Sequence, residues 1–327
     1  MLFRSILTSS DGTAWTRQSA SGYQDDWHGV GYGNGKWVVV GQSTNLLTST
    51  NGVGWEVHWP GFNPSYLKSV VYANGLWVAV GAAASIITSP DAVTWTQRAS
   101  PVSSDFNEVT YGNSVFVIVG DQSGTPNGKI LTSTDGVNWD DRTDASTGVN
   151  ARGIAFANGQ FVVALNDGNI LYGPDPISIA WSYAVTGVSN NGANLRGLTW
   201  SNGLWVATGN NGLLLTSTNA QVWKQRLTPT DQNLHAVRFF NGTFIAIGNA
   251  GTILQTGPLV PQLFAGRSGG NLQLTFSSPD EGVFKLQETD DFIWHDLATI
   301  TNAVGTVDFT VPLPPGTTRK FFRVIVP

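Results

Sequence analysis

Two sets of polar side chains recur at corresponding places along this 327-residue chain and are its candidates for chemistry. The first set, here called the start set, precedes a run of alternating small and apolar residues and comprises His28, Lys68, Asn107, Arg152, Arg196 and His235. The second set, the loop set, follows the next apolar run and comprises Gln42, Ala82, Asp121, Asn166, Asn210 and Asn249. A position kept for packing would repeat one residue type, whereas the start set varies and contains no apolar side chain. This pattern favours ligand binding.

Acid–base and metal chemistry are the first possibilities that these residue types allow. Paired imidazoles act near neutral pH as a general base and its orienting partner, so His28 and His235 are the candidate catalytic residues. Carboxylate and amide oxygens are ligands that Ca²⁺ prefers, and a bound Ca²⁺ would polarise a carbonyl group. The candidate metal ligands are the oxygen-bearing members of the loop set, Asp121, Asn166, Asn210 and Asn249. Ca²⁺ is the only cofactor that the sequence suggests.

The cations of the start set indicate a different ligand. Lys68, Arg152 and Arg196 would repel a metal ion, and they suit a carboxylate or another anionic group. Asn107 and Gln42 would add hydrogen-bonding groups to the same surface. The alternative is a solvated rim without a ligand, because exposed polar residues are the rule on protein surfaces.

These residues are positioned by a sequence repeat whose marker runs from Ser, through Asp or Asn and then Gly or Ala, to Trp. Clean copies end at Trp15, Trp55, Trp95, Trp139 and Trp223, and a worn copy ends at Trp181. Successive Trp residues are therefore 40, 40, 44, 42 and 42 positions apart. A repeat of this length is typical of a β-propeller, in which each blade is a four-stranded sheet.

Each repeat predicts two inner strands joined by a tight turn, then a third strand, then the Ser-to-Trp turn and a fourth strand. Asn-Gly, which supplies the positive φ of a two-residue hairpin, occupies the first turn in five repeats. Counting the inner strand pairs predicts six blades over residues 1–258, with His28 and His235 as neighbours where the ring closes. Third and fourth strands at the N-terminus would complete the last blade by strand exchange. With six blades, the count then includes one surplus strand of the third-strand type that has no position in any blade.

The Ser-to-Trp marker resembles the Asp-box, or BNR repeat, of sialidases, propeller-type endoglucanases and photosystem assembly factors. The resemblance implies a propeller whose Asp-box turns are structural and lie on the outer rim. Asp11, Asp91 and Asp135 are therefore not expected to be catalytic. A true sialidase is not expected, because no Tyr–Glu pair aligns with the one that reaction needs, and the propeller holds only Glu56 and Glu108.

Residues 262–327 are expected to form a second domain. The repeat stops before them, and short alternating strands punctuated by prolines indicate a small β-sandwich. The phrases Leu286 to Trp294 and Arg319 to Val324 resemble C-terminal modules of exported proteins from Verrucomicrobia-like and Planctomycetes-like bacteria. That resemblance implies a secreted or periplasmic protein, with the export signal absent from this chain.

Composition excludes several classes of function. The formal net charge is −5 and no run of Lys and Arg occurs, which argues against nucleic acid as a partner. The chain has no cysteine, so disulfides and thiolate metal sites are excluded. No apolar run approaches the ~20 residues that are needed to span a bilayer.

The interpretation that we favour is an exported, all-β, six-bladed propeller that binds a small oxygen-rich ligand in its central funnel. The ligand would be an ester or lactone, hydrolysed with the help of Ca²⁺ and with His28 and His235 as acid and base. The alternative is a non-catalytic propeller that binds a glycan or a protein surface. A structural assembly factor is a third interpretation, which rests only on the resemblance to the photosystem propellers.

Overall fold

The computed structural model is built almost entirely of β-strands. It describes residues 6–12, 14–18, 25–122, 128–143, 149–178, 181–188, 193–240, 242–256, 262–268, 271–278, 282–289, 295–302, 305–312 and 321–325. The chain divides into two compact units, Met1–Phe239 with Ile245–Leu254, and Phe240–Phe244 with Gln255–Pro327. The second unit thus contains a short turn that the sequence placed in the propeller. In the described part of the chain, no helix has the length and apolar character that a membrane span needs.

The first complete blade shows how the repeat folds. Its antiparallel strands are β3 (Trp27–Gly33), β4 (Lys36–Gly41), β5 (Leu46–Ser49) and β6 (Glu56–His58). β4 contains a continuous apolar run, and all four residues of β5 are buried, because neighbouring structure covers both faces of these strands. Val38, Val40 and Leu46 are fully buried there, whereas β6 is the exposed edge of the blade.

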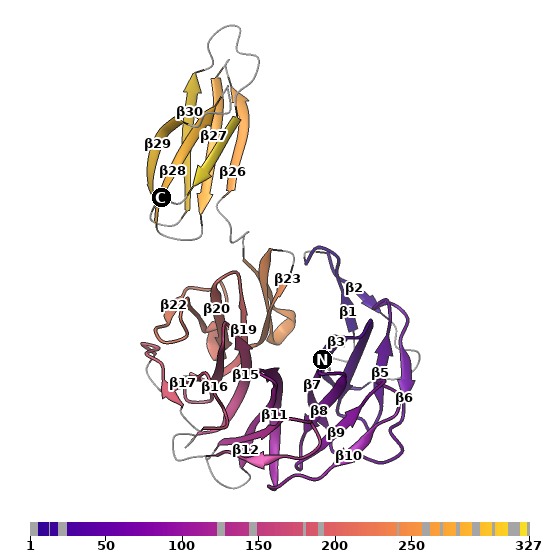
Figure 1. The fold of residues 1–327 in the computed structure, drawn as a ribbon. Coiled ribbons are helices and arrows are strands. Elements are labelled where there is room, and N and C mark those ends of the chain that lie inside the picture. Colours follow the sequence, from indigo (N-terminus) through magenta and orange to yellow (C-terminus); the bar gives the residue numbers. More distant parts are fainter. Residues whose placement is uncertain are drawn as a thin grey trace. The chain divides into compact units, whose positions relative to one another are not determined.

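Five further sheets follow the same plan. Four of them have four strands: β7 (Leu67–Ala73), β8 (Leu76–Gly81), β9 (Ile86–Ser89), β10 (Thr96–Arg98); β11 (Ser104–Gly112), β12 (Val115–Gln122), β13 (Gly128–Ser133), β14 (Asp140–Asp141); β15 (Ala151–Ala157), β16 (Gln160–Leu165), β17 (Ile170–Gly173), β18 (Ser182–Tyr183); β19 (Leu195–Ser201), β20 (Leu204–Gly209), β21 (Leu214–Ser217), β22 (Lys224–Arg226). The last has β23 (Leu234–Phe240), β24 (Thr243–Gly248) and β25 (Ile253–Gln255). The innermost strands β3, β7, β11, β15 and β19 contact one another in succession (Figure 1). The predicted six-bladed propeller is therefore confirmed.

The Ser-to-Trp marker folds as a hydrogen-bonded turn between the third and fourth strands. In one copy, the Asp91 carboxylate accepts hydrogen bonds at 2.8 and 2.7 Å from the N–H groups two and three residues ahead. The Trp95 indole donates to the carbonyl of Ala92 at 3.1 Å. The same side-chain bonds recur at Asn51, Asp135 and Asn219. These acidic and amide groups hold the turn, as the sequence predicts.

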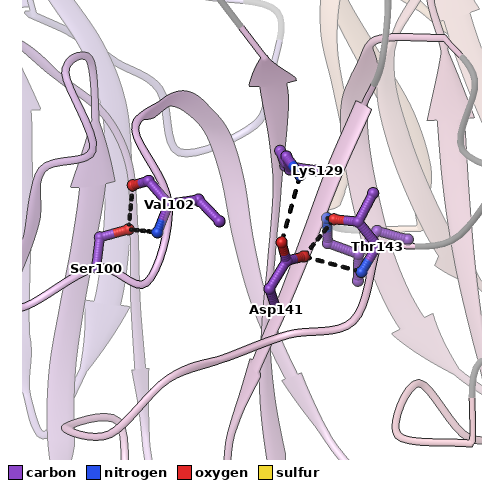
Figure 2. A network of polar contacts seen from close by, with 6 residues as sticks. Ser100, Val102, Lys129, Asp141 and Thr143 are labelled. Atoms are coloured by element: carbon purple, nitrogen blue, oxygen red, sulfur yellow. Dashed lines mark hydrogen bonds and ion pairs between the residues drawn. The ribbon is translucent and has the colours of Figure 1, made fainter.

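The outer strand of the third blade is short and is held by side chains. Figure 2 shows the Asp141 carboxylate on β14 between Lys129 and Thr143. The carboxylate accepts the Thr143 N–H at 2.9 Å, and Lys129 Nζ lies 3.3 Å away. Ser100, also in the figure, forms a separate small turn by accepting the N–H of Val102 at 3.2 Å. Such contacts replace the ladder bonds that a two-residue strand lacks.

The expected strand exchange between the ends of the propeller is not found among the described strands. β1 (Ile6–Thr8) and β2 (Thr16–Gln18) pair with each other as a separate two-stranded sheet. β25 takes the third place beside β24, which accounts for the third strand that the sequence count could not place. The physical reason is proximity along the chain, because only the single 3₁₀ turn η3 (Asn249–Gly251) and Thr252 separate β24 from β25.

The second unit contains two antiparallel sheets after the propeller strands. One has the order β26 (Gln262–Ser268), β27 (Asn271–Ser278), β30 (Gly305–Pro312) and the other the order β29 (His295–Asn302), β28 (Gly282–Thr289), β31 (Phe321–Ile325). Leu274 and Val311 of the first sheet and Leu286 of the second are buried. Trp294 and Arg319, which carry part of the resemblance to exported modules, lie outside the described residues.

Candidate functional site

The start set lies on β-bulges at the beginning of the innermost strands. In β3 the pairing with β4 passes from Trp27 opposite Gly41 to Gly29 opposite Val40, which leaves His28 outside the ladder. The same irregularity occurs at the start of the next four blades, where the residues left out are Lys68, Asn107, Arg152 and Arg196. A bulge redirects the side chain of its extra residue. The variable polar position of the sequence is therefore a repeated structural device.

The loop set lies beside these bulges. Five of its members donate a backbone hydrogen bond of 2.9 or 3.0 Å to the strand that carries the start-set residue of the same blade. The acceptor in each case is the carbonyl two residues before that start-set residue. The five donors are Gln42, Ala82, Asn166, Asn210 and Asn249. Asp121, the sixth, is paired with Asp105 in the β11–β12 ladder. The structure thus brings the two predicted sets together, at the same end of the inner strand pair in every blade.

Lys68 and Arg152 take part in a polar network that crosses three blades. Lys68 Nζ lies 2.9 Å from Asn107 Oδ1 and 3.8 Å from the carboxylate of Asp105. Arg152 Nη1 lies 2.6 Å from Asp121 Oδ2. Burial lowers the pKa of Lys68 and raises the pKa of Asp121, with opposing effects from their charged neighbours. The opposite charges nearby therefore limit both shifts without reversing them.

Asn107 is the bridge of this network. Its side-chain Nδ2 donates to the carbonyl of Ala151 on the next blade at 2.9 Å, while its Oδ1 accepts from Lys68. The Asn107 side chain also opposes the rise in the pKa of Asp121. An amide suits this position because it offers a donor and an acceptor at once.

Arg196 is the least satisfied cation of the start set. Its Nε donates to Asn210 Oδ1 at 3.3 Å, and none of the described residues forms an ion pair with it. Burial, followed by the charge of nearby Arg152, lowers the pKa of Arg196. Two guanidinium groups that lie close together attract an anion, because a shared counter-charge relieves their repulsion.

The two candidate catalytic histidines occupy their predicted positions with different neighbours. The ring of His28 lies 5.0 Å from the ring of Tyr66, and partial burial lowers the pKa of His28. His235 Nε2 lies 2.6 Å from Asn249 Oδ1. Among the described residues, no contact joins His28 to His235, so their action as a pair stays a prediction.

The candidate calcium ligands fit an anion site better than a calcium site. Asp121 is the only carboxylate among them, and it is already paired with the guanidinium of Arg152. Asn210 accepts a hydrogen bond from Arg196, and Asn249 contacts His235. The described residues contain no cluster of three His, Cys, Asp or Glu side chains arranged for a metal. Ca²⁺ needs several oxygen ligands that are free of cations, and Asp121 and Asn210 do not meet that condition.

An ion pair between distant blades was not foreseen from the sequence. Glu108 Oε1 on β11 accepts from Arg238 Nη2 on β23 at 3.2 Å, across 130 positions of the chain. The other carboxylate oxygen accepts the N–H of Ile154 at 2.9 Å, and Arg238 Nη1 also reaches the carbonyl of Leu198. Burial raises the pKa of Glu108, opposed by Arg238. The only signal was that both residues replace small or apolar ones in the repeat.

No protein-family model matches the sequence, and no curated protein does. Solved structures match its fold. YCF48 bound to D1 peptide is 18% identical, with a TM-score of 0.62 over 77% of this chain and 84% of that chain. YCF48 from Cyanidioschyzon merolae is 15% identical, with a TM-score of 0.61 over 79% of this chain and 89% of that one. A catalytically inactive histidine-to-alanine variant of virginiamycin B lyase from Staphylococcus aureus, with quinupristin, is 10% identical, with a TM-score of 0.61 over 78% and 93%.

Proposed function

We propose that this propeller binds an oxygen-rich ligand through a carboxylate group, at the face formed by the start and loop sets. The observation that carries the proposal is the row of cations on consecutive or alternate blades at the bulge position: Lys68, Arg152 and Arg196. Arg196, which no described carboxylate neutralises, is the residue expected to contact the ligand directly.

Unused hydrogen-bonding atoms support a polar ligand. Arg152 Nε and Asp121 Oδ1 are buried and lack a hydrogen-bond partner among the described residues, although the other atoms of the same groups are paired. Asn150 Oδ1 and Asn194 Oδ1, beside the same strand starts, are in the same condition. Buried polar atoms without partners are costly, and a ligand or water that bonds them lowers that cost.

The fold comparison favours a peptide as the source of the carboxylate. The structure described as YCF48 bound to D1 peptide shows that a propeller of similar fold binds a peptide. A peptide carries an oxygen-rich backbone and a terminal carboxylate, which match the amides and guanidinium groups of this face. This proposal follows the non-catalytic alternative of the sequence interpretation, with a peptide in place of a glycan.

The proposal is tested by calorimetric titration with random hexapeptides that have either a free or an amidated C-terminus. We expect the free acids to bind more tightly, and Arg196→Met to weaken their binding by about 10- to 100-fold, as for the loss of a charged hydrogen bond. The matched control is Arg226→Met on the outer strand β22, whose Nε bonds Thr216. Equal binding of acids and amides, or an equal effect of both variants, would refute a carboxylate site.

Hydrolysis of an ester or lactone is the second candidate. His235 favours it, because this exposed imidazole lies on the same face and Asn249 fixes its orientation at 2.6 Å. Loss of one histidine inactivates the virginiamycin B lyase of similar fold. Proton release would be followed in a pH-stat with lactones and simple esters, with and without a Ca²⁺ chelator. Turnover that is lost in His235→Ala would support hydrolysis. No turnover on any substrate would rule hydrolysis of these compounds out and leave binding as the proposed function.

Two further elements of the interpretation remain proposals. The Asp-box assignment is supported by the repeated carboxylate and indole hydrogen bonds of the Ser-to-Trp turns. Export from the cell rests on the resemblance of residues 262–327 to modules of exported proteins. Secretion of the protein with its native upstream sequence would test it directly.

A further inference from the structure

A recurring joint links the turn between the second and third strands of one blade to the start of the next blade. In the turn after β8, the N–H of Ala83 donates to Asp105 Oδ1 at 2.9 Å. The next N–H, that of Ala84, donates to the carbonyl of Ser104 at 2.6 Å. Asp105 stands two residues before Asn107, the start-set residue of its blade. The joint thus consists of one bond to a side chain and one bond to the backbone.

The turn after β20 makes the same joint with the last blade. The N–H of Asn211 donates to Asn233 Oδ1 at 3.0 Å. The N–H of Gly212 donates to the carbonyl of Gln232 at 2.9 Å. Asn211 and Gly212 have φ values of 56° and 68°, and the corresponding residues after β8 have values of 49° and 59°. In both joints, a turn with two consecutive positive φ values presents two adjacent N–H groups to the next blade.

Two other pairs of consecutive blades lack a part of this joint. The second blade has Tyr66 where the third blade has Asp105, and a phenol ring does not supply a carboxylate or amide oxygen. In the turn after β16, Asp167 does not have a positive φ, and its own carboxylate accepts the N–H of Asn169 at 3.0 Å. The turn after β12 includes residues 123–127, which lie outside the described residues. The joint thus needs both an acceptor at the start of the next blade and a turn with two positive φ values.

The last turn of the propeller has the donors of such a joint. After β24, Ala250 and Gly251 have φ values of 54° and 75°. The N–H of Thr252 donates to the carbonyl of Asn249 at 3.0 Å, and equivalent bonds of 3.1 and 3.0 Å close the other two turns. Within the described part of the chain, the N–H groups of Ala250 and Gly251 do not donate to another blade. This turn therefore has the conformation that the joint needs.

The first blade holds an acceptor of the matching kind. Asp26 stands two residues before His28, at the place that Asp105 and Asn233 hold in their own blades. Its Oδ1 is buried, and none of the described residues donates a hydrogen bond to it. A buried acceptor without a donor is costly, so a donor that reaches Asp26 is favoured. The N–H groups of the last turn and this carboxylate match the two halves of the joint.

The last and first blades also expose the two halves of one apolar interface. Between the first and second blades, Val40 and Val70 belong to a single buried cluster. The corresponding residues at the seam between the last and first blades are Ile247 on β24 and Val30 on β3, which are 46% and 60% exposed. Bringing these two blades together removes both side chains from water, which is favourable. The seam is therefore the place where the ring can close.

The residue that accepts in this joint also faces the start-set residue of the preceding blade. The carboxylate of Asp105 lies 3.8 Å from Lys68 Nζ of the preceding blade. The ring of Tyr66, at the same place in the second blade, lies 5.0 Å from the ring of His28. At the seam, the residues in these two places are an aspartate of the first blade and a histidine of the last blade.

We infer that the ring has a closed state in which Asp26 completes the joint at the seam. The carboxylate of Asp26 accepts the N–H of Ala250 and lies beside His235. The carbonyl of Asp25 accepts the N–H of Gly251. The first and last blades are then joined by the same two hydrogen bonds that join the second blade to the third and the fifth to the sixth.

The closed state brings the two ends of the start set together. His28 follows Asp26 by two residues, and Asn249, which lies 2.6 Å from His235, directly precedes Ala250. Asp26 is therefore a positioning residue, because it fixes the turn that orients His235 and places a negative charge beside the imidazole. This role does not depend on the ligand that the propeller binds.

Amide hydrogen exchange, followed residue by residue by NMR, tests the joint in the protein without a ligand. Asp26→Ala is expected to speed the exchange of the Ala250 amide at least about tenfold, as for the loss of a hydrogen bond to a charged group. Asn233→Ala, at a joint that the structure shows, sets the scale through the amide of Asn211. An Ala250 amide that exchanges equally fast with and without the Asp26 side chain would overturn the inference.

Asp26→Asn separates the hydrogen bond from the charge. An amide oxygen accepts the N–H of such a turn, as Asn233 does, so the Ala250 amide should stay protected in this variant. The ring-nitrogen resonances of His235 should shift at constant pH, because the carboxylate charge beside the imidazole is lost. The ring of His58, which contacts a threonine hydroxyl at 2.8 Å in the first blade, is the internal reference and should not respond.

Asp25→Asn is the matched control for this charge change. The joint uses the carbonyl of Asp25 and not its side chain, so both the Ala250 amide and the His235 ring should behave as in the unsubstituted protein. A shift of His235 in both variants, or in neither, would contradict its pairing with Asp26. Because both measurements are made without a ligand, their failure would leave the carboxylate proposal intact, and absence of peptide binding would leave this inference intact.

Discussion

At the scale of single residues, the bulge explains how one position of the repeat carries four types of polar side chain, His, Lys, Asn and Arg. A residue such as Arg152 lies outside the ladder, so its side chain is not required to pack between blades. Its neighbour Gly153 is in the ladder and is tightly constrained, because a Cβ there would lie 2.4 Å from the carbonyl oxygen of Arg196. In this blade a residue free of the ladder is thus followed directly by one that packs closely against the next blade.

The turn carboxylates are expected to contribute to stability and not to chemistry. Asp91→Ala removes the acceptor of two backbone N–H groups and should lower the free energy of unfolding by about 1 kcal/mol. Asn51 makes the same bonds with an amide oxygen at 2.9 Å. Asp91→Asn should therefore cost less than about 0.5 kcal/mol. Urea unfolding at neutral pH measures both, and equal losses would contradict the role of the acceptor.

The same carboxylate predicts a pH dependence. Hydrogen bonds from the N–H groups of Thr94 and Val93 lower the pKa of Asp91 from 3.8 to about 2. Because the pKa is lower in the folded state, the stabilisation is present above pH 3.8 and is lost as the pH falls towards 2. The difference in the free energy of unfolding between the unsubstituted protein and Asp91→Asn should therefore shrink as the pH falls from 3.8 towards 2. An advantage that is constant with pH would show that ionisation is irrelevant.

The Glu108–Arg238 pair should respond to pH in the opposite direction. In Arg238→Met, the Glu108 carboxylate would keep only its hydrogen bond from the N–H of Ile154. The free energy of unfolding is therefore expected to fall by about 2 kcal/mol at neutral pH. Burial raises the pKa of Glu108, so the folded state binds its proton more tightly than the unfolded state. Stability of the variant should therefore be greatest below the ordinary Glu pKa and decrease as the pH rises through the raised value.

Urea unfolding between pH 4 and 8 follows this effect. Adding Glu108→Gln to Arg238→Met is the control, since the double variant has no carboxylate to titrate at this point. Its stability should not share the decrease, and a similar slope in both variants would contradict the assignment.

At the scale of elements, the inner hairpins depend on positive φ. Asn34 and Gly35 have φ values of 48° and 74°, which two-residue turns of this type require. The third blade has Asn113 and Ser114 instead, and Ser114 adopts φ of 62°. A side chain other than Gly or Asn is strained in this region.

Ser114→Gly is therefore expected to raise the free energy of unfolding by about 0.5 kcal/mol. Relief of about 1–2 kcal/mol of strain is partly offset by the greater freedom of glycine in the unfolded chain. Ser103→Gly, at an exposed loop position without a positive φ, should be neutral or destabilising. Thermal unfolding compares the two variants, and stabilisation by both would show that the backbone conformation is not the cause.

Sequence reasoning succeeded for elements that a local pattern specifies. The Asn-Gly turns, the apolar second strands and the two recurring polar positions follow from short-range periodicity, so the blades and both polar sets could be predicted, whereas the bulges that hold the start set were not foreseen. The Glu108–Arg238 pair could not, because its partners lie 130 positions apart and no repeat copy contains the same pair. The contacts of His28 and His235 depended on ring closure, which is a property of the whole chain.

At the scale of the whole molecule, the pairing of β25 explains why the expected strand exchange is not seen among the described strands. Strand exchange between β1 and the last blade would need contacts between distant segments, whereas β25 reaches β24 through a single turn. The last sheet therefore has three strands, and β1 and β2 stand beside the first blade. The count of six inner strand pairs was right because it depends only on the local repeat.

The bulge also bears on how such a protein changes over time. Because the extra residue is outside the ladder, a substitution there leaves the backbone register of the blade intact, whereas the side chains of Lys68, Asn107 and Arg152 remain linked to neighbouring blades. Recognition and folding are thereby assigned to different positions of the same strand. A gene encoding this repeat can therefore acquire a new specificity by changing the bulge residues while the strand ladder of each blade is kept.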